Sequence, residues 1–507
     1  MYDALIIGAG VGGLSCAAKL AVNGKRILIL EKIHHIGGTS HIFKRAQYSF
    51  PMGPLSFSFP NLVKNLINKM GLNEDITFQR NHFQLISPDL DIIYSQDWKE
   101  FKENLKNQFS QEEKAIDAFF EEFNKIITAI NKVHEWHPDF LIGKKRAKAL
   151  ENVLLTHKQE YELINHYNEI FSKDVLNKYF KNDSLKRLLG TQGTFEPVMN
   201  MVHLAFMWNV MSKEGIWFPS CGIHGINQLL QESISKNGGE IKLNTPVKEI
   251  LIENQKVIGV KTSEDQIYNS KWIVANADYK KVFLELINPS KIPKTHLDMV
   301  KNTAYTGSEL CVYLGIDPKK VDLSKMRANH LFYRGKIDNS ISKNPEYFEN
   351  KEIEICLWSN KSEKFAPEGR KSLILRVNMP FSYFNKWRLG EKKRKVGYQE
   401  YKKELAQKLI KNVEKILPGL TNAVEIMEIA TPLTYLDWGQ RFEGSVAGWS
   451  RDIKKIRLNT KLLTENPIKN LLVVGIYSVL EPFLGGYPVS MYTGNLAADY
   501  ILEKEMY

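Results

Sequence analysis

The fold of this chain is decided by residues 4–13, which read Ala-Leu-Ile-Ile-Gly-Ala-Gly-Val-Gly-Gly. The apolar run at its start is typical of a parallel strand that is buried on both faces. Apolar residues at helical spacing follow up to Gly24, and a second apolar strand over 26–30 ends at Glu31. The order of strand, glycine turn, helix, strand and acid predicts a parallel α/β unit.

The glycine spacing also predicts a ligand. Gly8 permits a tight turn, Gly10 lets the backbone approach a pyrophosphate, and Gly13 allows the helix to pack closely on the strand. The unpaired N–H groups at the helix N-terminus favour negative charge, and Glu31 can accept hydrogen bonds from ribose hydroxyls. A bound dinucleotide is therefore the leading interpretation, and a glycine-rich turn without a ligand is the alternative.

Length and composition set the wider frame. The 507 residues are too many for one ordinary core, and 43% hydrophobic with 25% charged residues is close to globular averages. We expect two or three folded domains, and global disorder is excluded. The formal net charge of +12 favours anionic partners such as lipid headgroups, nucleotides or nucleic acid, although the sequence carries no nucleic-acid recognition motif.

Cysteine spacing and hydropathy bear on the cellular location of the protein. The four cysteines lie far apart and form no CxxC pair, so neither a zinc site nor a disulfide framework is expected. We expect no secretory leader before the first strand, and the apolar runs are far shorter than the roughly 20 residues that span a bilayer. We expect a cytoplasmic protein without a metal site, whose membrane contact, if any, is peripheral.

Two segments between the glycine turn and the middle of the chain bear on the question of membrane contact. Residues 115–130 repeat apolar side chains at helical spacing and predict a long amphipathic helix, which packs on its own domain or faces a membrane. The basic cluster Lys144-Lys145-Arg146 with Lys148 predicts a solvated face or a lipid-surface contact.

A second recognisable block covers residues 215–286. A helix follows Gly222 and ends at Gly238-Gly239, and strands are predicted over 240–247, 249–253 and 257–261. The strand at 272–274 then leads into Ala275-Asn276-Ala277-Asp278. Near the C-terminus the strand 471–474 runs into Gly475, and a helix begins around Pro488.

These motifs resemble two related groups of flavoproteins. Glu31-Lys32 followed by Gly37-Gly38-Thr39-Ser40 resembles the FAD-binding start of glutathione-reductase-like and amine-oxidase-like enzymes. Residues 215–278, the "TPxT" segment at 431–434 and the "R…G…GW" segment at 441–449 resemble carotenoid desaturases, carotenoid isomerases and retinol saturases. The resemblance runs from Tyr2 to Tyr500.

The resemblance implies a fold and a cofactor. The fold is α/β, with a Rossmann-like, glutathione-reductase-like FAD-binding domain and an inserted α+β substrate domain. It places residues 1–75, 200–300 and 430–507 in the FAD-binding domain and residues 76–199 and 301–429 in a substrate-binding or lid domain. The FAD-contacting residues that it implies are Gly8, Gly10, Gly13, Glu31, Lys32, Gly38, Thr39, Val247, Gly475, Gly486 and Val489.

One position departs from the family pattern. Many members have Gly-Asp where this chain has Gly475-Ile476, so a carboxylate that would bond the ribityl chain is missing. Glu481, in the spacer that follows, can partly substitute for it.

The activity that the resemblance implies is an FAD-dependent oxidoreductase acting on carbon–carbon bonds of a polyprenoid or other long apolar lipid. Desaturation, saturation and isomerisation all remain open. Arg441 is the candidate that fixes developing charge, while Tyr435 or Glu309 moves a proton. Alternatively, Arg441 pairs with Glu443 or Asp437, and Tyr435 is a core aromatic residue.

Further alternatives remain at this point. His224 forms a loop hydrogen bond or lies near the flavin ring. The chain can also be a flavin amine or amino-acid oxidase, or a non-enzymatic prenyl-lipid carrier similar to the Rab GDP-dissociation inhibitors. An apolar lipid is the expected partner, together with a peripheral membrane surface, and nucleic acid is not expected.

Overall fold

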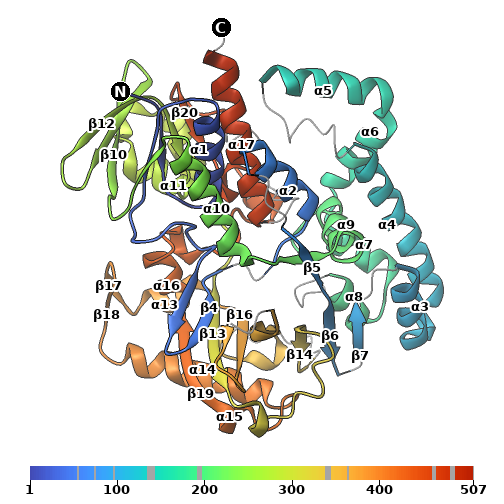
Figure 1. The fold of residues 1–507 in the computed structure, drawn as a ribbon. Coiled ribbons are helices and arrows are strands. Elements are labelled where there is room, and N and C mark those ends of the chain that lie inside the picture. The colour runs from blue at the N-terminus through green and yellow to red at the C-terminus, as the bar shows by residue number, and fades with distance from the viewer. Residues whose placement is uncertain are drawn as a thin grey trace.

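The computed structural model describes residues 1–53, 56–72, 76–88, 90–94, 98–133, 143–190, 197–336, 344–361, 365–458, 464–479 and 486–505 (Figure 1). Two seven-stranded sheets and a set of helices between residues 98 and 209 form the body of the molecule.

The first sheet draws its strands from distant parts of the chain. In spatial order they are β10 (Val247–Glu253), β11 (Lys256–Thr262), β12 (Ile267–Ala275), β1 (Tyr2–Ile7), β2 (Ile27–Leu30) and β9 (Glu240–Lys242), with β20 (Leu471–Val473) beside β12. β1 runs parallel to β2 and β12, and β20 runs parallel to β12, so their carboxyl ends meet at one edge. Ligands of open α/β sheets bind at this edge. The predicted Rossmann-like α/β unit is confirmed.

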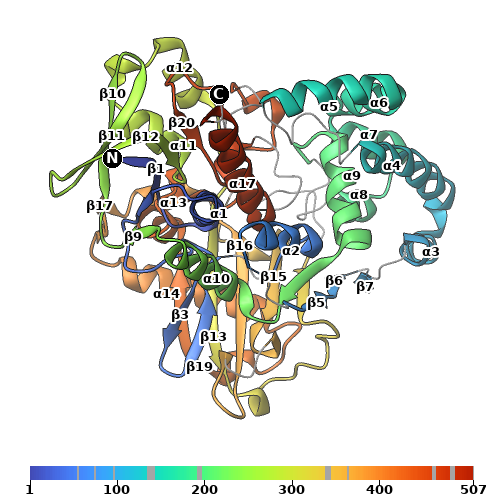
Figure 2. The ribbon, with the colours of Figure 1, turned by 45° about the horizontal axis from the view of Figure 1, so that its top comes forward.

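Helices cover both faces of this sheet. The first face carries α1 (Val11–Val22), α2 (Pro60–Lys69), α10 (Gly222–Lys236) and α17 (Gly486–Glu505), whose buried side chains form one core (Figure 2). The second face carries α11 (Tyr279–Lys281) and α12 (Lys294–Asn302). α1 and α17 lie against each other, so the N-terminal glycine turn and the C-terminal segment are neighbours (Figure 1).

The second sheet is mostly antiparallel. Its order is β19 (Val424–Ala430), β13 (Glu309–Ile316), β16 (Lys371–Asn378), β15 (Glu352–Leu357), β14 (His330–Arg334), β6 (Phe83–Ser87) and β7 (Leu90–Tyr94), and only β14 and β6 run parallel. β6 and β7 pair antiparallel and form a hairpin at the end of this sheet.

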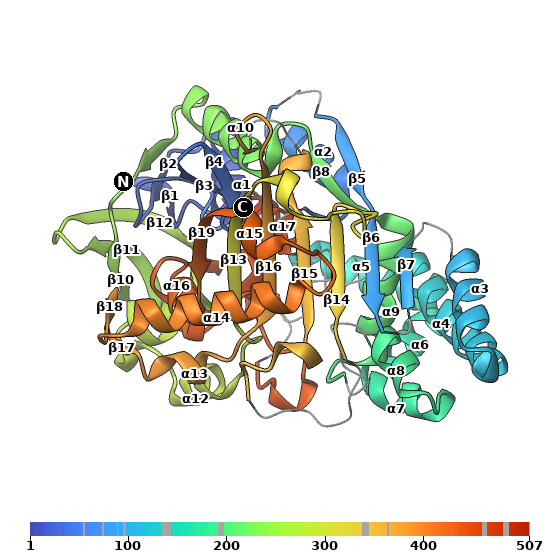
Figure 3. The same ribbon diagram turned by 90° about the horizontal axis from the view of Figure 1, so that it is seen from below.

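The two faces of this second sheet differ in chemistry. Its outer face is apolar and packs against α14 (Tyr398–Val413), with α13 (Phe381–Asn385) and α15 (Leu420–Ala423) nearby (Figure 3). Its inner face turns toward the hairpin of β3 (Ile42–Arg45) and β4 (Tyr48–Pro51) and mixes aromatic residues with charged ones. The inner face therefore belongs to the interior of the molecule without being a wholly apolar core.

A helical segment flanks the edge of the second sheet (Figure 1). It contains α3 (Trp98–Gln108), α4 (Glu113–Val133), α5 (Gly143–Thr156), α6 (Lys158–Asn168), α7 (Ser172–Tyr179), α8 (Asp183–Leu189) and α9 (Met201–Asn209). α4 is the predicted amphipathic helix. Its apolar stripe is buried against neighbouring helices of this segment, which confirms packing on the chain's own core rather than a membrane-facing stripe.

Three short β pairs and one short helix complete the description. They are β3 with β4, β5 (Phe78–Asn81) with β8 (Ile216–Pro219), β17 (Arg388–Gly390) with β18 (Lys393–Arg394), and α16 (Pro432–Asp437). Among the residues that the structure describes, no helix combines the length and the apolar character that a bilayer crossing needs. The division into 1–75, 200–300 and 430–507 against 76–199 and 301–429 stays a prediction, although the first sheet takes all its strands from the first group.

Candidate active site

The glycine turn after β1 is packed too tightly for side chains. A Cβ on Gly13 would lie 2.2 Å from the carbonyl oxygen of Gly8, and one on Gly10 would lie 2.6 Å from Nδ2 of Asn276. Gly8 has a φ of +95°, which L side chains rarely adopt. The positive φ of Gly8 and the close contact at Gly13 agree with a tight turn and with close packing of the helix on the strand. The approach of a pyrophosphate to Gly10 stays a prediction.

The turn leaves the N-terminus of α1 open to a ligand. Gly10 is the N-cap residue and provides no side-chain cap, and the first turn contains no acidic residue. The free N–H groups and the positive end of the helix dipole suit a diphosphate. A Cβ on Gly12 would lie 3.0 Å from the carbonyl oxygen of Ser490 and 3.1 Å from the amide nitrogen of Gly475, so both ends of the chain meet at this turn.

Glu31 ends β2 beside this turn. Its Oε2 accepts a hydrogen bond from the Ala9 amide at 2.6 Å and its Oε1 accepts one from the Ile33 amide at 3.0 Å. Burial raises the pKa of the Glu31 carboxyl, against the lowering effect of these amides. Each carboxylate oxygen keeps a further lone pair, so a ribose hydroxyl can still donate to it.

The second glycine pair lies against the first. The Gly37 amide donates to the carbonyl oxygen of Ala9 at 2.7 Å, and a Cβ on Gly38 would lie 3.5 Å from the Cα of Gly10. The Lys32 ammonium instead forms a salt bridge at 2.9 Å with Glu391, beside β17. This salt bridge connects the end of β2 with the turn between β17 and β18. The proposed contact of Lys32 with FAD stays a prediction.

The remaining cofactor candidates sit around the same edge. Val247 begins β10, two residues after Thr245, whose amide donates to the carbonyl oxygen of Glu31 at 2.8 Å. Gly486 and Val489 lie in the first turn of α17, and Val489 is buried. Glu481, the suggested substitute for the missing ribityl carboxylate, lies outside the described residues.

Taken together, these residues fit an FAD molecule. The glycine-lined turn, the uncapped helix and the carboxylate beside it supply what a diphosphate and an adenine ribose require. When bound, the flavin ring can take or give a hydride.

Arg441 connects the flavin segment with the second sheet. Its Nη2 donates to Oγ1 of Thr39 at 2.8 Å, and its Nη1 donates to the carbonyl oxygens of Val446 at 2.8 Å and Ser445 at 3.3 Å. The alternative expectation of an ion pair with Asp437 is wrong, because Asp437 is paired with Arg394.

The two motifs around Arg441 have structural roles. In the "TPxT" segment, Thr431 and Thr434 form a capping box at the start of α16 and so fix Tyr435 in the second turn. In the "R…G…GW" segment, Gly444 has a φ of +63°, and its Cβ would lie 2.3 Å from the carbonyl oxygen of Pro432. The Trp449 indole donates to the carbonyl oxygen of Tyr477 at 3.0 Å.

Asp278 anchors the same loop from the first sheet. Its carboxylate accepts hydrogen bonds from the Phe442 amide at 2.9 Å, from the Lys280 amide at 2.9 Å and from the Tyr305 hydroxyl. Burial raises the pKa of the Asp278 carboxyl, while these donors lower it. The sequence singled out the Asn-Ala-Asp turn without assigning this contact, which holds Arg441 at a fixed distance from the glycine turn.

Tyr435 and Glu309, both predicted as proton-moving residues, are in contact. The Tyr435 hydroxyl donates to Oε1 of Glu309 at 2.6 Å, and the Arg376 guanidinium donates to both oxygens of Glu309 at 2.9 and 3.0 Å. Burial raises the pKa of Tyr435 well above its usual value, and the Glu309 charge raises it further. Tyr435 therefore stays protonated and neutral. Its hydroxyl also has a hydrogen-bond partner, as expected under the alternative that Tyr435 is a core aromatic residue.

The contacts continue across the inner face of the second sheet. Nη1 of Arg376 lies 3.4 Å from Oε2 of Glu354, and Nε2 of His330 lies 2.6 Å from Oε1 of the same carboxylate. Tyr435, Glu309, Arg376, Glu354 and His330 thus form a continuous row, which we name the charged strip. It crosses β13, β16, β15 and β14 and starts beside the Arg441 loop, where Ser308 donates to the carbonyl oxygen of Gly444 at 2.7 Å.

The pairing within the strip affects protonation. Burial raises the pKa of Glu354, but the charge of Arg376 and the hydrogen bond from His330 outweigh it and hold this pKa at about 2. The pKa of Arg376 is well above its usual value; burial lowers it, and Glu309 and Glu354 raise it more. The strip therefore keeps charged groups in the interior near neutral pH.

His224 begins α10 and belongs to a group of histidines. The rings of His35 and His41 stack at 4.0 Å, and those of His34 and His35 meet edge to face at 5.0 Å. Burial, followed by the charges of His35, His224 and His34, lowers the pKa of His41 to about 4. His224 therefore lies near the segment that follows Gly37 and Gly38. Both predictions for it, a loop hydrogen bond and a place near the flavin ring, stay predictions.

Three members of the strip were missed by the sequence analysis: Arg376, Glu354 and His330. The available signal was a charged residue at alternate positions of an otherwise apolar strand, as in Glu352 and Glu354 of β15. Which of these side chains meet depends on the order of β13, β16, β15 and β14, and this order is not sequential.

Comparison with known proteins defines the class. Residues 11–481 match the family described as flavin containing amine oxidoreductase, so the chain belongs to that family. It is an FAD-dependent oxidoreductase, and the carrier alternative is set aside.

Within that class the chain is similar to proteins with lipid-related names. It is 25% identical to prolycopene isomerase, chloroplastic, of Arabidopsis thaliana (100% of this chain, 84% of that protein). It is 24% identical to all-trans-retinol 13,14-reductase of Danio rerio (100% and 87%). It is 23% identical to 1-hydroxycarotenoid 3,4-desaturase of Flavobacterium sp. (strain P99-3) (99% and 99%).

Solved structures share the fold. An oxidoreductase from Methanosarcina mazei has a TM-score of 0.62 at 15% identity, covering 99% of both chains. Putrescine oxidase bound to putrescine has a TM-score of 0.62 at 11% identity, covering 100% of this chain and 99% of that one. At these identities the likeness concerns the fold alone.

Proposed function

We propose that this FAD-dependent oxidoreductase acts on carbon–carbon bonds of a polyprenoid or other long apolar lipid. The observation that carries the proposal is the end-to-end similarity to relatives whose names refer to carotenoids and retinol. The amine oxidases among the structural neighbours are similar at only 11% to 12% identity, so oxidation of an amine is the weaker candidate.

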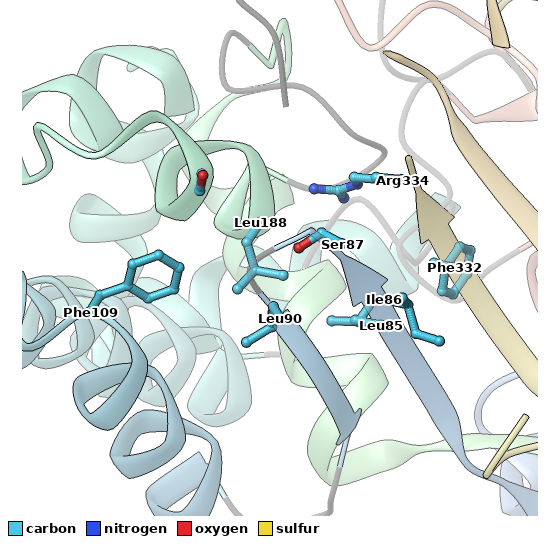
Figure 4. Close-up of a pocket in the computed structure, with 9 residues that line it drawn as sticks. Leu85, Ile86, Ser87, Leu90, Phe109, Leu188, Phe332 and Arg334 are labelled. Atoms are coloured by element: carbon cyan, nitrogen blue, oxygen red, sulfur yellow. The ribbon is translucent and has the colours of Figure 1, made fainter. Parts of the chain in front are cut away.

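An apolar hollow supports a lipid substrate. It is a small hollow, open to solvent, between the β14–β6–β7 end of the second sheet and the helical segment (Figure 4). Most of its lining is apolar: Leu85, Ile86, Leu90, Phe109, Leu188 and Phe332, with Ser87, Ser184 and Arg334 as the polar members. Ligand pockets with this composition suit hydrocarbon chains and use their few polar groups to orient the ligand.

The chain's own residues then have separate tasks. Arg441, held by Thr39 on one side and by two carbonyl oxygens on the other, provides a fixed positive charge between the flavin segment and the second sheet. The pair of Tyr435 and Glu309 holds a proton on the Tyr435 oxygen, 2.6 Å from its acceptor. We assign the fixed charge to Arg441 and the movable proton to this pair.

Extraction of the purified chain tests the proposal. Organic extraction followed by mass spectrometry is expected to yield a polyprenoid bound in the protein, and incubation with that lipid class is expected to change its number or geometry of double bonds. Putrescine serves as the comparison substrate. Oxidation of putrescine without any change in a polyprenoid would overturn the proposal.

We also propose a cytoplasmic location with peripheral membrane contact through α5. None of the four cysteines, all of which the structure describes, is in a disulfide, which suits a reducing compartment. On α5, Leu154 and Leu155 have 43% and 78% of their surface exposed, and Lys148 is exposed on the same helix. The side chains of Lys144, Lys145 and Arg146 lie outside the described residues.

A further inference from the structure

The charged strip lies inside a molecule that we propose to bind an apolar lipid. We propose that it is a hydroxyl-binding subsite, and that the substrate is a polyprenoid bearing a hydroxyl group rather than a pure hydrocarbon. The inference rests on the proposed function, because it concerns the polar end of the same lipid.

The strip is continuous with the apolar hollow. Phe332, which lines the hollow, is the cross-strand partner of Glu354. Its ring also stacks against the ring of His330 at 5.4 Å and against that of Phe83 at 5.7 Å. Phe332 therefore joins the lining of the hollow to Glu354 and His330 of the charged strip.

The strip also borders open space. Its neighbours on the same sheet face, Cys311, Cys356 and Ile374, are each only 1% exposed. The side chains of Arg376 and Glu354, by contrast, keep 21% and 23% of their surface accessible. The two charged residues at the centre of the strip are thus within reach of a ligand.

The hydrogen-bonding positions that remain open on the charged strip are acceptors, so the strip favours a ligand group that donates a hydrogen bond. Arg376 directs Nε and Nη2 at Glu309 and Nη1 at Glu354, so its donors face carboxylates already. The carboxylate oxygens have more lone pairs than these contacts use. An anionic end group would meet two carboxylates, and an ammonium group would lose its hydration on entering the apolar hollow. A neutral hydroxyl avoids both costs.

Stability alone does not explain the strip. Paired charges inside a protein are often no more stabilising than well-packed apolar residues of the same volume. A site that hydrogen-bonds a hydroxyl, on the other hand, discriminates strongly against an analogue that lacks it.

Equilibrium binding to the FAD-loaded chain tests the inference. The probes are geranylgeraniol, its methyl ether, its amine analogue and the hydrocarbon of the same chain length, followed by the change in flavin absorbance. We expect the alcohol to bind at least about tenfold more tightly than the ether or the hydrocarbon, because the ether oxygen cannot donate. Equal affinity for alcohol and ether, or a preference for the amine, would overturn the inference.

Variants locate the effect. E354Q is expected to reduce the preference for the alcohol about tenfold, because a neutral amide is a weaker acceptor than a carboxylate. The matched control is E425Q on β19, since Glu425 also accepts from a tyrosine (Tyr48, 3.1 Å) and an arginine (Arg370, 2.8 Å). Unchanged preference in E354Q would refute the assignment, as would an equal loss in E425Q.

The design separates the two proposals. Equal, tight binding of alcohol and hydrocarbon leaves the proposed function standing and removes the hydroxyl subsite. If neither the alcohol nor the hydrocarbon binds, the hydroxyl subsite and the proposed function are both refuted. If E354Q does not fold, the comparison of alcohol with ether in the unaltered chain decides.

Discussion

Arg441 is the residue at which the parts of the site meet. It reaches Thr39 in the N-terminal flavin segment, and its own loop is held by Asp278 from the first sheet and by Ser308 next to β13. Its guanidinium is only partly buried, and it contacts neutral oxygens in every hydrogen bond that the structure describes. A positive charge without a carboxylate partner is available to stabilise negative charge that develops nearby.

Replacement of Arg441 tests this role. R441M is expected to keep its flavin and to lower turnover about tenfold to a hundredfold, because the fixed charge is lost while the cofactor cradle is not. R457M is the matched control, since Arg457 also donates from Nη1 to two carbonyl oxygens but lies away from Thr39. Flavin content and turnover are measured on both variants, and unchanged turnover in R441M would remove Arg441 from the site.

Glu354 predicts a pH dependence of stability. Its pKa of about 2 lies below the value of about 4.3 for a glutamate in an unfolded chain, so the unfolded chain takes up the proton first as the pH falls. The stabilisation is complete above about pH 4.3 and is lost toward pH 2, by at most about 3 kcal/mol.

Urea unfolding between pH 6 and pH 3 measures this effect. The free energy of unfolding of E354Q is expected to change less with pH than that of the unaltered chain over this interval. The same pH dependence in both proteins would contradict the charge pairing of the strip.

At the scale of elements, the contact of α1 with α17 builds the cofactor cradle. The two helices approach so closely that a Cβ on Gly494 would lie 2.1 Å from the carbonyl oxygen of Gly12, in the first turn of α1. The same turn presents its free N–H groups to the diphosphate. Helix packing and cofactor binding are therefore coupled through one glycine contact.

G494A is expected to disturb both the packing of α17 on α1 and the binding of FAD. The added methyl group would push α17 away from α1, which costs about 1 to 3 kcal/mol of stability and moves the diphosphate site. G390A is the control, because a Cβ on Gly390 meets only the Lys393 side chain at 4.0 Å. Thermal unfolding and FAD content together check the prediction; a G494A protein with full FAD content and unchanged stability would count against the coupling.

The sequence predicts these elements unevenly. The strand, glycine turn, helix and Glu31 of the N-terminus could be predicted because their partners lie within about thirty residues and each glycine has a steric reason. Tyr435 and Glu309 could be offered only as alternative candidates, and their contact is known from the structure alone. Glu354 and His330 could not be placed, because their meeting depends on long-range strand order and not on any local pattern.

At the scale of the whole molecule, the chain separates a cofactor end from a lipid end. The first sheet presents the glycine turn at one edge, and the second sheet with its helical segment encloses the apolar hollow. The Arg441 loop and the charged strip lie between them. α5 lies at the outside of the molecule, at the end of the helical segment (Figure 2).

Membrane contact through α5 is testable by sedimentation with anionic liposomes at low salt. The double variant L154S/L155S is expected to sediment less than the unaltered chain, because two exposed apolar side chains are removed. High salt is expected to weaken binding further if lysine and arginine residues contribute. Sedimentation that is the same for both proteins would exclude this helix as the contact.

The most direct test of the whole account is the flavin content of the purified, dialysed chain. We predict about one FAD per chain, visible as flavin absorbance and released on denaturation, because the glycine turn, the uncapped α1 and Glu31 are all in place. A folded but colourless chain that takes up no added FAD would contradict the account.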